Sequence, residues 1–282
     1  MTVAGIAVAE ADLHCHILPA WDDGPRTLED SLSMAARASE AGIKTILVTP
    51  HVGKAFGGKP ERAARDIPAA TAVLQGELQE RGIALQLIPG AEITLGSPDL
   101  PERIANEPWL TVGGQGHYVL VEALTNHWPD YADQLLFQIS LRKVTPIIAH
   151  PERYDNVQRD PSILEQAVKS GVLLQITARS LLGEERPSKR CCLELLEAGM
   201  VAIIASDTHA ARGVLPGAVE AKLYSLVGEA AAQQILVENP RRVLAGESVP
   251  RLAPVVKVSG RRKLWDFSQR LGKPRLGKPQ RA

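Results

Sequence analysis

The stretch "DLHCHILPAWDDGP", residues 12–25, places two histidines two residues apart and follows them with two aspartates. Side chains alternate between the faces of a β-strand, so His14 and His16 would point the same way, about 6–7 Å apart along the strand. Cys15 would point to the opposite face. Because two imidazoles so placed can bind one metal ion, the pair predicts a metal site near the start of the chain.

Short apolar runs recur along the chain and alternate with helical patterns. They cover residues 11–18, 44–51, 85–93, 118–123, 145–152, 172–177 and 201–209. Several are almost continuously apolar, which is typical of parallel strands buried on both faces. Between the first two runs, Thr27 and Asp30 form a capping-box pattern, and Gly42 follows the last helical positions. About seven β–α units predict an α/β fold, either a barrel or a doubly wound sheet.

Histidines and carboxylates fall at or near the ends of these runs. The eight are His14, His16, His51, Glu92, Glu122, His150, Asp207 and His209. The carboxyl ends of parallel strands are where active sites are built in barrels and open sheets. Imidazole and carboxylate ligands without thiolate favour Mn, Fe, Zn or Co. Because the candidates outnumber the ligands of one tetrahedral site, we expect two or three ions that share carboxylates and activate a water molecule.

Each of these residues also has an ordinary structural interpretation. A single strand-end histidine can cap or pack, and "SDTH", residues 206–209, can be a helix N-cap. Their coincidence at successive strand ends favours the metal site. His117 and His127 lie away from strand ends and are expected at the surface. Cys191 and Cys192 belong to a helical pattern and are expected to pack in the core.

Composition limits the setting of the protein. No apolar run reaches the roughly 20 residues of a membrane helix, and the first residues lack a secretory pattern. Three cysteines form neither a disulfide framework nor a zinc cluster, which favours a reducing compartment. We therefore expect a cytoplasmic protein.

The zero formal charge conceals an uneven distribution. Residues 250–282 hold ten Lys or Arg against one acidic residue, so residues 1–249 hold 22 basic and 31 acidic side chains, a net of −9. This predicts one folded domain over 1–249 and a basic, flexible tail over 250–282. The tail could contact anionic lipid of the inner membrane or only aid solubility. The acidic body argues against a nucleic-acid enzyme.

The motifs resemble the PHP (polymerase and histidinol phosphatase) superfamily. Within it they resemble bacterial manganese-dependent protein-tyrosine phosphatases encoded with capsule and exopolysaccharide genes. The resemblance runs from about residue 11 to 245 and rests on residues 12–51, "PGAEI" (89–93), "LVE" (120–122), "IIAHPERY" (147–154) and "IASDTH" (204–209). "DDGP" and "AHPERY" are its most specific parts, because other PHP branches usually lack them.

This resemblance implies a distorted (β/α)7 barrel with three metal ions, most often manganese, at the carboxyl ends of the strands. It implies ligand roles for His14, His16, Asp23, His51, Glu92, Glu122, His150, Asp207 and His209. Asp23, and not Asp22, matches the family aspartate directly before the glycine. Arg153 matches a phosphate-binding arginine, and Arg212 is the candidate for a second, although its offset from His209 is short.

The implied activity is hydrolysis of phosphotyrosine on a protein, with a membrane-associated tyrosine kinase of polysaccharide synthesis as the expected partner. The alternatives are another PHP phosphomonoesterase, such as a histidinol-phosphate phosphatase, or a metal-binding scaffold without turnover. Trp21 and Phe56 could stack on a substrate ring or anchor their loops. The glycine-rich stretch "HVGKAFGGKP", residues 51–60, predicts a mouth open to a protein segment.

Overall fold

The computed structural model describes residues 9–53, 64–183 and 186–254 of the 282-residue chain. Phe56, most of the glycine-rich stretch and the basic tail from residue 255 onward lie outside the described residues. The predicted boundary between a folded domain and a tail therefore stays a prediction.

The strands in the described residues pair in parallel and form two sheets. One sheet has the order β1-β2-β4, and the other has the order β3-β5-β6-β7-β8-β9. Their bounds are β1 Ala11–Cys15, β2 Thr45–Val48, β3 His51–Val52, β4 Gln86–Pro89, β5 Glu92–Leu95, β6 Tyr118–Ala123, β7 Thr145–Ala149, β8 Leu173–Thr177 and β9 Val201–Ala205. All seven predicted runs contain a strand, and the predicted α/β class is confirmed.

The second and third runs each break into two strands, which the sequence patterns did not predict. Pro50 separates β2 from β3, and proline cannot donate a ladder hydrogen bond. Gly90 separates β4 from β5 at a place where a Cβ atom would lie 2.9 Å from Leu47 Cδ1. The two breaks transfer the chain from the first sheet to the second, which is the distortion of the barrel.

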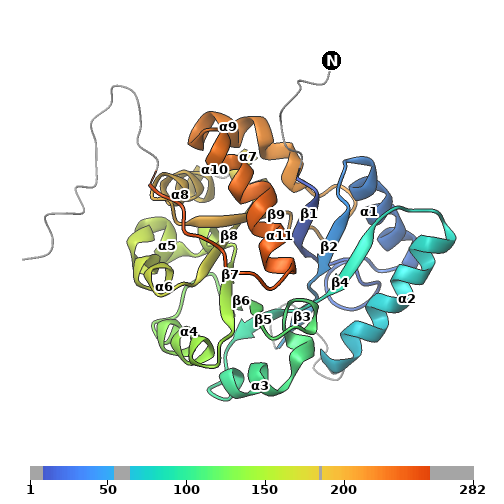
Figure 1. The fold of residues 1–282 in the computed structure, drawn as a ribbon, viewed down its shortest axis with the longest axis horizontal. Helices are drawn as coiled ribbons and strands as arrows, with labels where there is room; N and C mark the ends of the chain where they lie inside the picture. Colours follow the sequence, from blue (N-terminus) through green and yellow to red (C-terminus); the bar gives the residue numbers. More distant parts are fainter. Residues whose placement is uncertain (1–8, 54–63, 184–185, 255–282) are drawn as a thin grey trace, which may run out of the picture.

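The first and last strands meet and bring the ring of strands together. The His16 N–H donates to the Thr208 carbonyl at 3.0 Å, and the Asp207 N–H donates to the His14 carbonyl at 2.8 Å. Figure 1 shows β1, β2 and β4 on one side of this ring and β6, β7 and β8 on the other, with helices outside them. The fold is therefore a barrel-like α/β arrangement of seven parallel β–α units, two of them with split strands.

Helices cover the outside of the ring. Their bounds are α1 Leu28–Glu40, α2 Ile67–Glu80, α3 Leu100–Asn106, α4 Ala132–Leu141, α5 Asp155–Arg159, α6 Glu165–Lys169, α7 Ala178–Leu182, α8 Arg186–Glu197, α9 Glu220–Val227, α10 Glu229–Gln233 and α11 Asn239–Leu244. The capping box of α1 is confirmed: the Asp30 N–H donates to Thr27 Oγ1, and the Thr27 N–H donates to Asp30 Oδ2. None of the described helices is long and apolar enough to cross a membrane.

Helix α11 lies across one end of the ring (Figure 1). Asn239 at its start donates from Nδ2 to the carbonyl of Ala202, near the amino end of β9. The helix therefore covers the amino ends of the strands and leaves their carboxyl ends for the polar residues.

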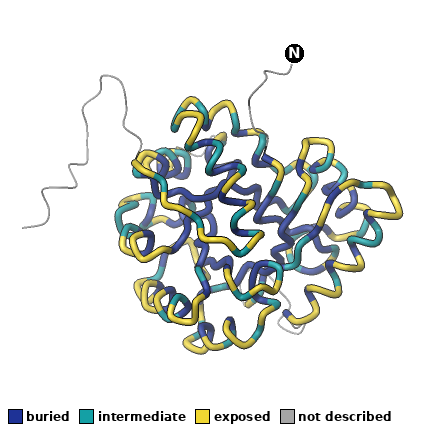
Figure 2. Tube along the Cα trace, viewed as in Figure 1, coloured by how far each residue is buried: buried dark blue, intermediate teal, exposed yellow. Residues whose placement is uncertain are grey.

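The core confirms the expectations for several side chains. The buried part of the chain follows the strands, whereas the exposed part follows the outer helices and loops (Figure 2). Cys15, Cys191 and Cys192 are buried, and burial raises the pKa of the Cys191 thiol to about 12, as expected for packing residues. His117 and His127 are exposed. Trp21 packs in the core rather than at an open surface.

Candidate metal centre

The nine candidate ligands come from six of the seven units of the ring, all except the unit of β8. His14 lies in β1 and His16 directly after it, Glu122 lies in β6, and His150 follows β7. Asp207 and His209 follow β9, and Asp23 lies in the loop after β1. His51 and Glu92 differ from the prediction, because they open β3 and β5 instead of ending a strand. The breaks at Pro50 and Gly90 place both at the point where the chain changes sheets.

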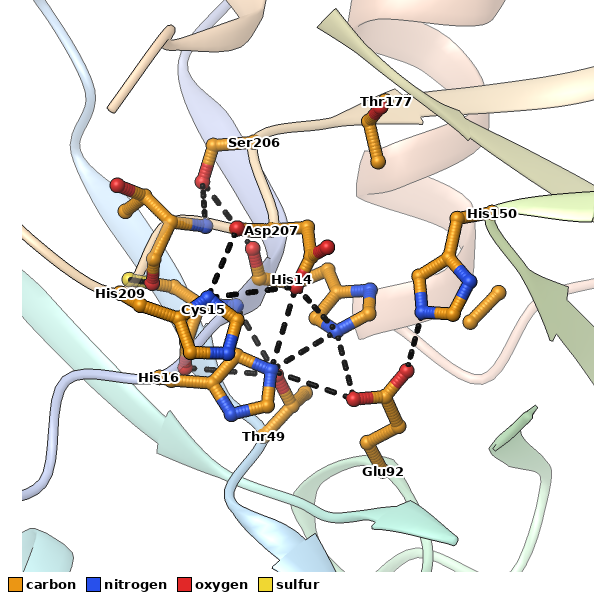
Figure 3. Close-up of polar contacts among 12 residues, drawn as sticks. His14, Cys15, His16, Thr49, Glu92, His150, Thr177, Ser206, Asp207 and His209 are labelled. Carbon is orange, nitrogen blue, oxygen red and sulfur yellow. Dashed lines mark hydrogen bonds and ion pairs between the residues drawn. The ribbon is translucent and has the colours of Figure 1, made fainter. Parts of the chain in front are cut away.

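An inner group of four side chains forms the most compact part of the cluster: His14, His16, Glu92 and Asp207. The Nε2 atoms of His14 and His16 are 3.1 Å apart. Both lie 3.1–3.2 Å from Glu92 Oε2 and 3.2–3.3 Å from Asp207 Oδ1 (Figure 3). Ligands about 2.0–2.1 Å from one ion lie roughly 3 Å from each other. The spacing in the inner group fits one shared metal ion.

An outer group extends the cluster toward solvent, with His16, Asp23, His51 and His209. Asp23 Oδ1 lies 3.4 Å from His51 Nε2 and 3.2 Å from His209 Nε2. The His209 ring stacks on His16 with ring centroids 3.9 Å apart. The side chains of Asp23 and His209 are 45% and 30% exposed, whereas those of His14, His16 and Glu92 are fully buried. The cluster therefore opens to solvent on the side of Asp23 and His209.

A bridging group links these ligands to the remaining two. His51 Nδ1 lies 3.2 Å from Glu92 Oε2 and 3.1 Å from Glu122 Oε1. His150 Nε2 lies 2.9 Å from Glu92 Oε1 and 4.0 Å from Glu122 Oε2. Glu92 thus faces four imidazoles with its two oxygens, which is the arrangement of a carboxylate that two ions can share.

The surroundings of Glu92 Oε2 show whether a metal ion fits among these side chains. Glu92 Oε2 has no hydrogen-bond partner with proper geometry, although three imidazole nitrogens lie within 3.2 Å of it. An ionised oxygen left in this state is costly inside a protein. A cation among these nitrogens and oxygens removes that cost, so the residues present fit a metal cluster.

Two of the candidate ligands have strained backbone conformations. His150 has φ 35° and Asp207 has φ 51°, in the left-handed region that disfavours residues with a Cβ. Each follows directly on a strand or one residue later, so the turn directs its side chain into the cluster (Figure 3). Such strain, on the order of 1–3 kcal/mol per residue, is typical of functional sites.

Opposite charges dominate the electrostatics of the cluster. Burial opposes ionisation of Glu92, but His14, His150 and His16 hold its pKa well below the usual value. Burial likewise opposes the charged form of His51, but hydrogen bonds to Asp23 and Glu122 raise its pKa to about 10. The pKa of His16 is also raised, because Asp207, Asp22 and Glu92 outweigh its burial. Without metal, the raised pKa values of His51 and His16 therefore favour their protonated forms at neutral pH.

Metal binding should release protons, because a coordinating imidazole must be neutral. In the metal-free protein the pKa of His51 is about 10, well above pH 7, so this side chain is protonated at pH 7. Calorimetric titration of metal-free protein with Mn²⁺ in two buffers of different ionisation enthalpy should show more than one proton released per chain, and the affinity should rise between pH 6 and 8. Equal binding heats in both buffers and a flat affinity profile would contradict this.

Sequence reasoning assigned no role to Asp22, which accepts hydrogen bonds from two of the candidate ligands. Asp22 Oδ2 accepts hydrogen bonds from His16 Nδ1 at 2.8 Å and from the His51 N–H at 3.0 Å, and Oδ1 accepts one from the Gly24 N–H. A carboxylate on the far nitrogen of a metal-binding histidine orients the ring and raises its basicity. The adjacent pair "DD" was the available signal, since only one of two neighbouring aspartates can point at the same ion.

The two candidate arginines differ in their positions. Arg153 lies in the turn Pro151–Arg153 after β7, and its Nη1 is 2.5 Å from Asp207 Oδ2. Its side chain is 37% exposed, so part of it is in contact with solvent. Arg212 is exposed in the loop after β9, and among the described residues no ion pair joins it to the cluster. Its role in phosphate binding remains a prediction.

The fold and the site define a class of proteins: parallel α/β barrels that can hold several metal ions among histidines and carboxylates at the carboxyl ends of their strands. Residues 10–245 match the family model described as capsular polysaccharide synthesis, CpsB/CapC, and the chain belongs to that family. It is 35% identical over 259 residues to the tyrosine-protein phosphatase YwqE of Bacillus subtilis (strain 168), which covers 91% of this chain and 99% of that protein.

Solved structures agree with this assignment. A crystal structure from work on YwqE of Bacillus subtilis and CpsB of Streptococcus pneumoniae, described as unique metal-dependent tyrosine phosphatases, matches with a TM-score of 0.77 and 32% identity. The match covers 88% of this chain and all of the other. The lactonase Lmo2620 of Listeria monocytogenes shares the fold alone, with a TM-score of 0.51, 14% identity, and coverage of 84% of this chain and 94% of the lactonase.

Proposed function

We propose that this chain is a metal-dependent protein-tyrosine phosphatase that acts in capsule or exopolysaccharide synthesis. The observation that carries the proposal is the convergence of all nine candidate ligands on Glu92 and its neighbours, with Arg153 at the edge of the same cluster. A scaffold without turnover would not need a partly exposed arginine beside a complete ligand set.

The bound ions would supply an activated water and neutralise charge on the phosphoryl group. The protein groups bind and orient the substrate. Among the described ligands, Asp23 and His209 have the most exposed side chains, so a phosphate would enter beside them. The guanidinium of Arg153 lies within reach of that side through its contact with Asp207. Its planar fork can donate to two phosphoryl oxygens at once, which lysine cannot do.

The leaving group is consistent with this arrangement. A tyrosine phenol has a pKa of about 10, so it needs less help from a proton donor than a serine alkoxide does. The histidines and carboxylates of the cluster are engaged with one another, and none is set aside as a separate acid. A phosphotyrosine substrate makes the smallest demand for such an acid.

We further propose two to three divalent ions, with manganese as the native metal and iron, zinc or cobalt as substitutes. The proposed substrate is a phosphotyrosine protein, in particular a membrane-associated bacterial tyrosine kinase. This places the enzyme in the cytoplasm, at the inner surface of the membrane where that kinase lies. The basic residues from 257 onward would favour anionic lipid by roughly 1 kcal/mol for each cation near the surface.

Substrate choice tests this proposal against the nearest alternative. The purified protein with Mn²⁺ should hydrolyse a phosphotyrosine peptide with a kcat/KM at least about tenfold above that for histidinol phosphate, a difference of about 1.4 kcal/mol in transition-state binding. A phosphoserine peptide is the matched control and should also be the poorer substrate. If histidinol phosphate is preferred, the tyrosine-phosphatase assignment is wrong, although a metallophosphoesterase would remain.

A further inference from the structure

Gln175 is a buried amide inside an otherwise apolar strand. It lies in the middle of β8, whose five residues are all buried, and it is 1% exposed. Its strand neighbours β7 and β9 are each followed by candidate ligands, whereas β8 contributes none. Burying an amide is costly unless it makes hydrogen bonds, so its partners indicate why it is there.

Both ends of this amide are used. Gln175 Nε2 donates to the carbonyl of Ile176 at 3.1 Å, and Oε1 lies 2.8 Å from Nδ1 of His14. The donor end is held by Ile176, so the end that faces His14 is the acceptor. His14 must therefore carry a hydrogen on Nδ1, which leaves the Nε2 lone pair free. That Nε2 is the atom that faces His16, Glu92 and Asp207 in the inner group.

We infer that Gln175 is a positioning residue of the metal centre, which fixes the ring and the tautomer of His14 so that Nε2 points at the metal. The inference rests on the proposed metal-dependent function. The two histidines of the pair are then oriented by unlike groups, since a carboxylate, Asp22, holds His16. The neutral amide orients His14 without adding a negative charge beside Asp207 and Glu92.

The test removes the acceptor and measures metal binding. Gln175→Met keeps an unbranched side chain of similar size but cannot accept from His14. Its affinity for Mn²⁺ at the tightest site, measured by competition with a chromogenic chelator, should fall about 10–100-fold. The visible spectrum of the Co²⁺-loaded protein should change, because His14 no longer presents Nε2 in one orientation. Phosphatase activity should recover at high Mn²⁺ concentration.

Two variants separate positioning from packing. Ile176→Val trims a buried side chain of the same strand and should leave the Mn²⁺ affinity within about twofold of the wild type. Gln175→Glu keeps a side-chain oxygen that can accept from His14 Nδ1, so it should retain most of the Mn²⁺ affinity that Gln175→Met loses. If Gln175→Met does not fold, Gln175→Asn withdraws the carbonyl by one methylene and should show the same loss.

The outcomes distinguish this inference from the proposed function. Wild-type Mn²⁺ affinity and an unchanged Co²⁺ spectrum in a folded Gln175→Met or Gln175→Asn protein would overturn the role of Gln175 and leave the phosphatase assignment standing. A wild-type protein that binds no Mn²⁺ would instead contradict the proposed metal-dependent function. Equal losses in Ile176→Val and Gln175→Met would also overturn the inference, because general packing would then explain both.

Discussion

Replacing Glu92 with glutamine should lower the kcat for a phosphotyrosine peptide by at least about a thousandfold. Glu92 Oε1 lies 2.9 Å from His150 Nε2, and Oε2 lies 3.1–3.2 Å from nitrogens of His14, His16 and His51. No other carboxylate among the candidate ligands has as many described imidazole partners. The amide keeps the shape but removes the charge, and it can offer only one oxygen to the ions. The metal content should fall together with the activity.

The matched control is Glu220→Gln, a carboxylate outside the cluster whose Oε1 is also buried without a hydrogen bond. It should retain activity within about twofold. Activity is measured under saturating Mn²⁺, and metal content by elemental analysis after gel filtration. A Glu92→Gln protein with normal metal content and near-normal turnover would show that Glu92 is not a shared ligand.

Arg153→Ala should lower kcat/KM by about 10²–10³-fold, both for a phosphotyrosine peptide and for a small aryl phosphate. The loss should be similar for both substrates because the guanidinium acts on the phosphoryl group that they share. Arg153→Lys should recover only part of the activity, since lysine keeps the charge but not the fork. Steady-state kinetics on the two substrates measures each effect.

Arg190→Ala is the control for removing a positive charge, because exposed Arg190 lies on α8 and pairs with Glu194, and no described ion pair joins it to a candidate ligand. It should leave both substrates unaffected. If Arg153→Ala lowered kcat/KM for the peptide alone, Arg153 would recognise the peptide and not the phosphoryl group. Arg212→Ala in the same series should cost less than Arg153→Ala, because Arg212 is exposed and no described contact ties it to the ligands.

The sequence predicted the fold class because each strand is marked locally, by a short apolar run between helical patterns. It did not predict the breaks at Pro50 and Gly90. Those depend on which sheet the chain joins after the break, and pairing partners such as β3 with β5 are far apart in sequence. The capping box at Thr27 was predictable because all of its contacts lie within four residues.

The candidate ligands were predictable for a similar reason, since polar residues at strand ends stand out against apolar runs. The residues that hydrogen-bond to these ligands from behind, such as Gln175, were not predictable. The hydrogen bond from His14 to Gln175 joins residues 161 positions apart, and no local pattern indicates it. A signal did exist in the glutamine within "VLLQIT", because a buried amide in a strand needs partners, but the sequence does not identify them.

The most direct test of this account measures metal and activity in the same preparation. Purified protein should contain at least two equivalents of transition metal and hydrolyse a phosphotyrosine peptide. Chelation followed by gel filtration should remove both metal and activity, and Mn²⁺ should restore activity better than Mg²⁺, because five of the nine candidate ligands are imidazoles. A metal-free preparation that remains fully active toward phosphotyrosine would contradict the account.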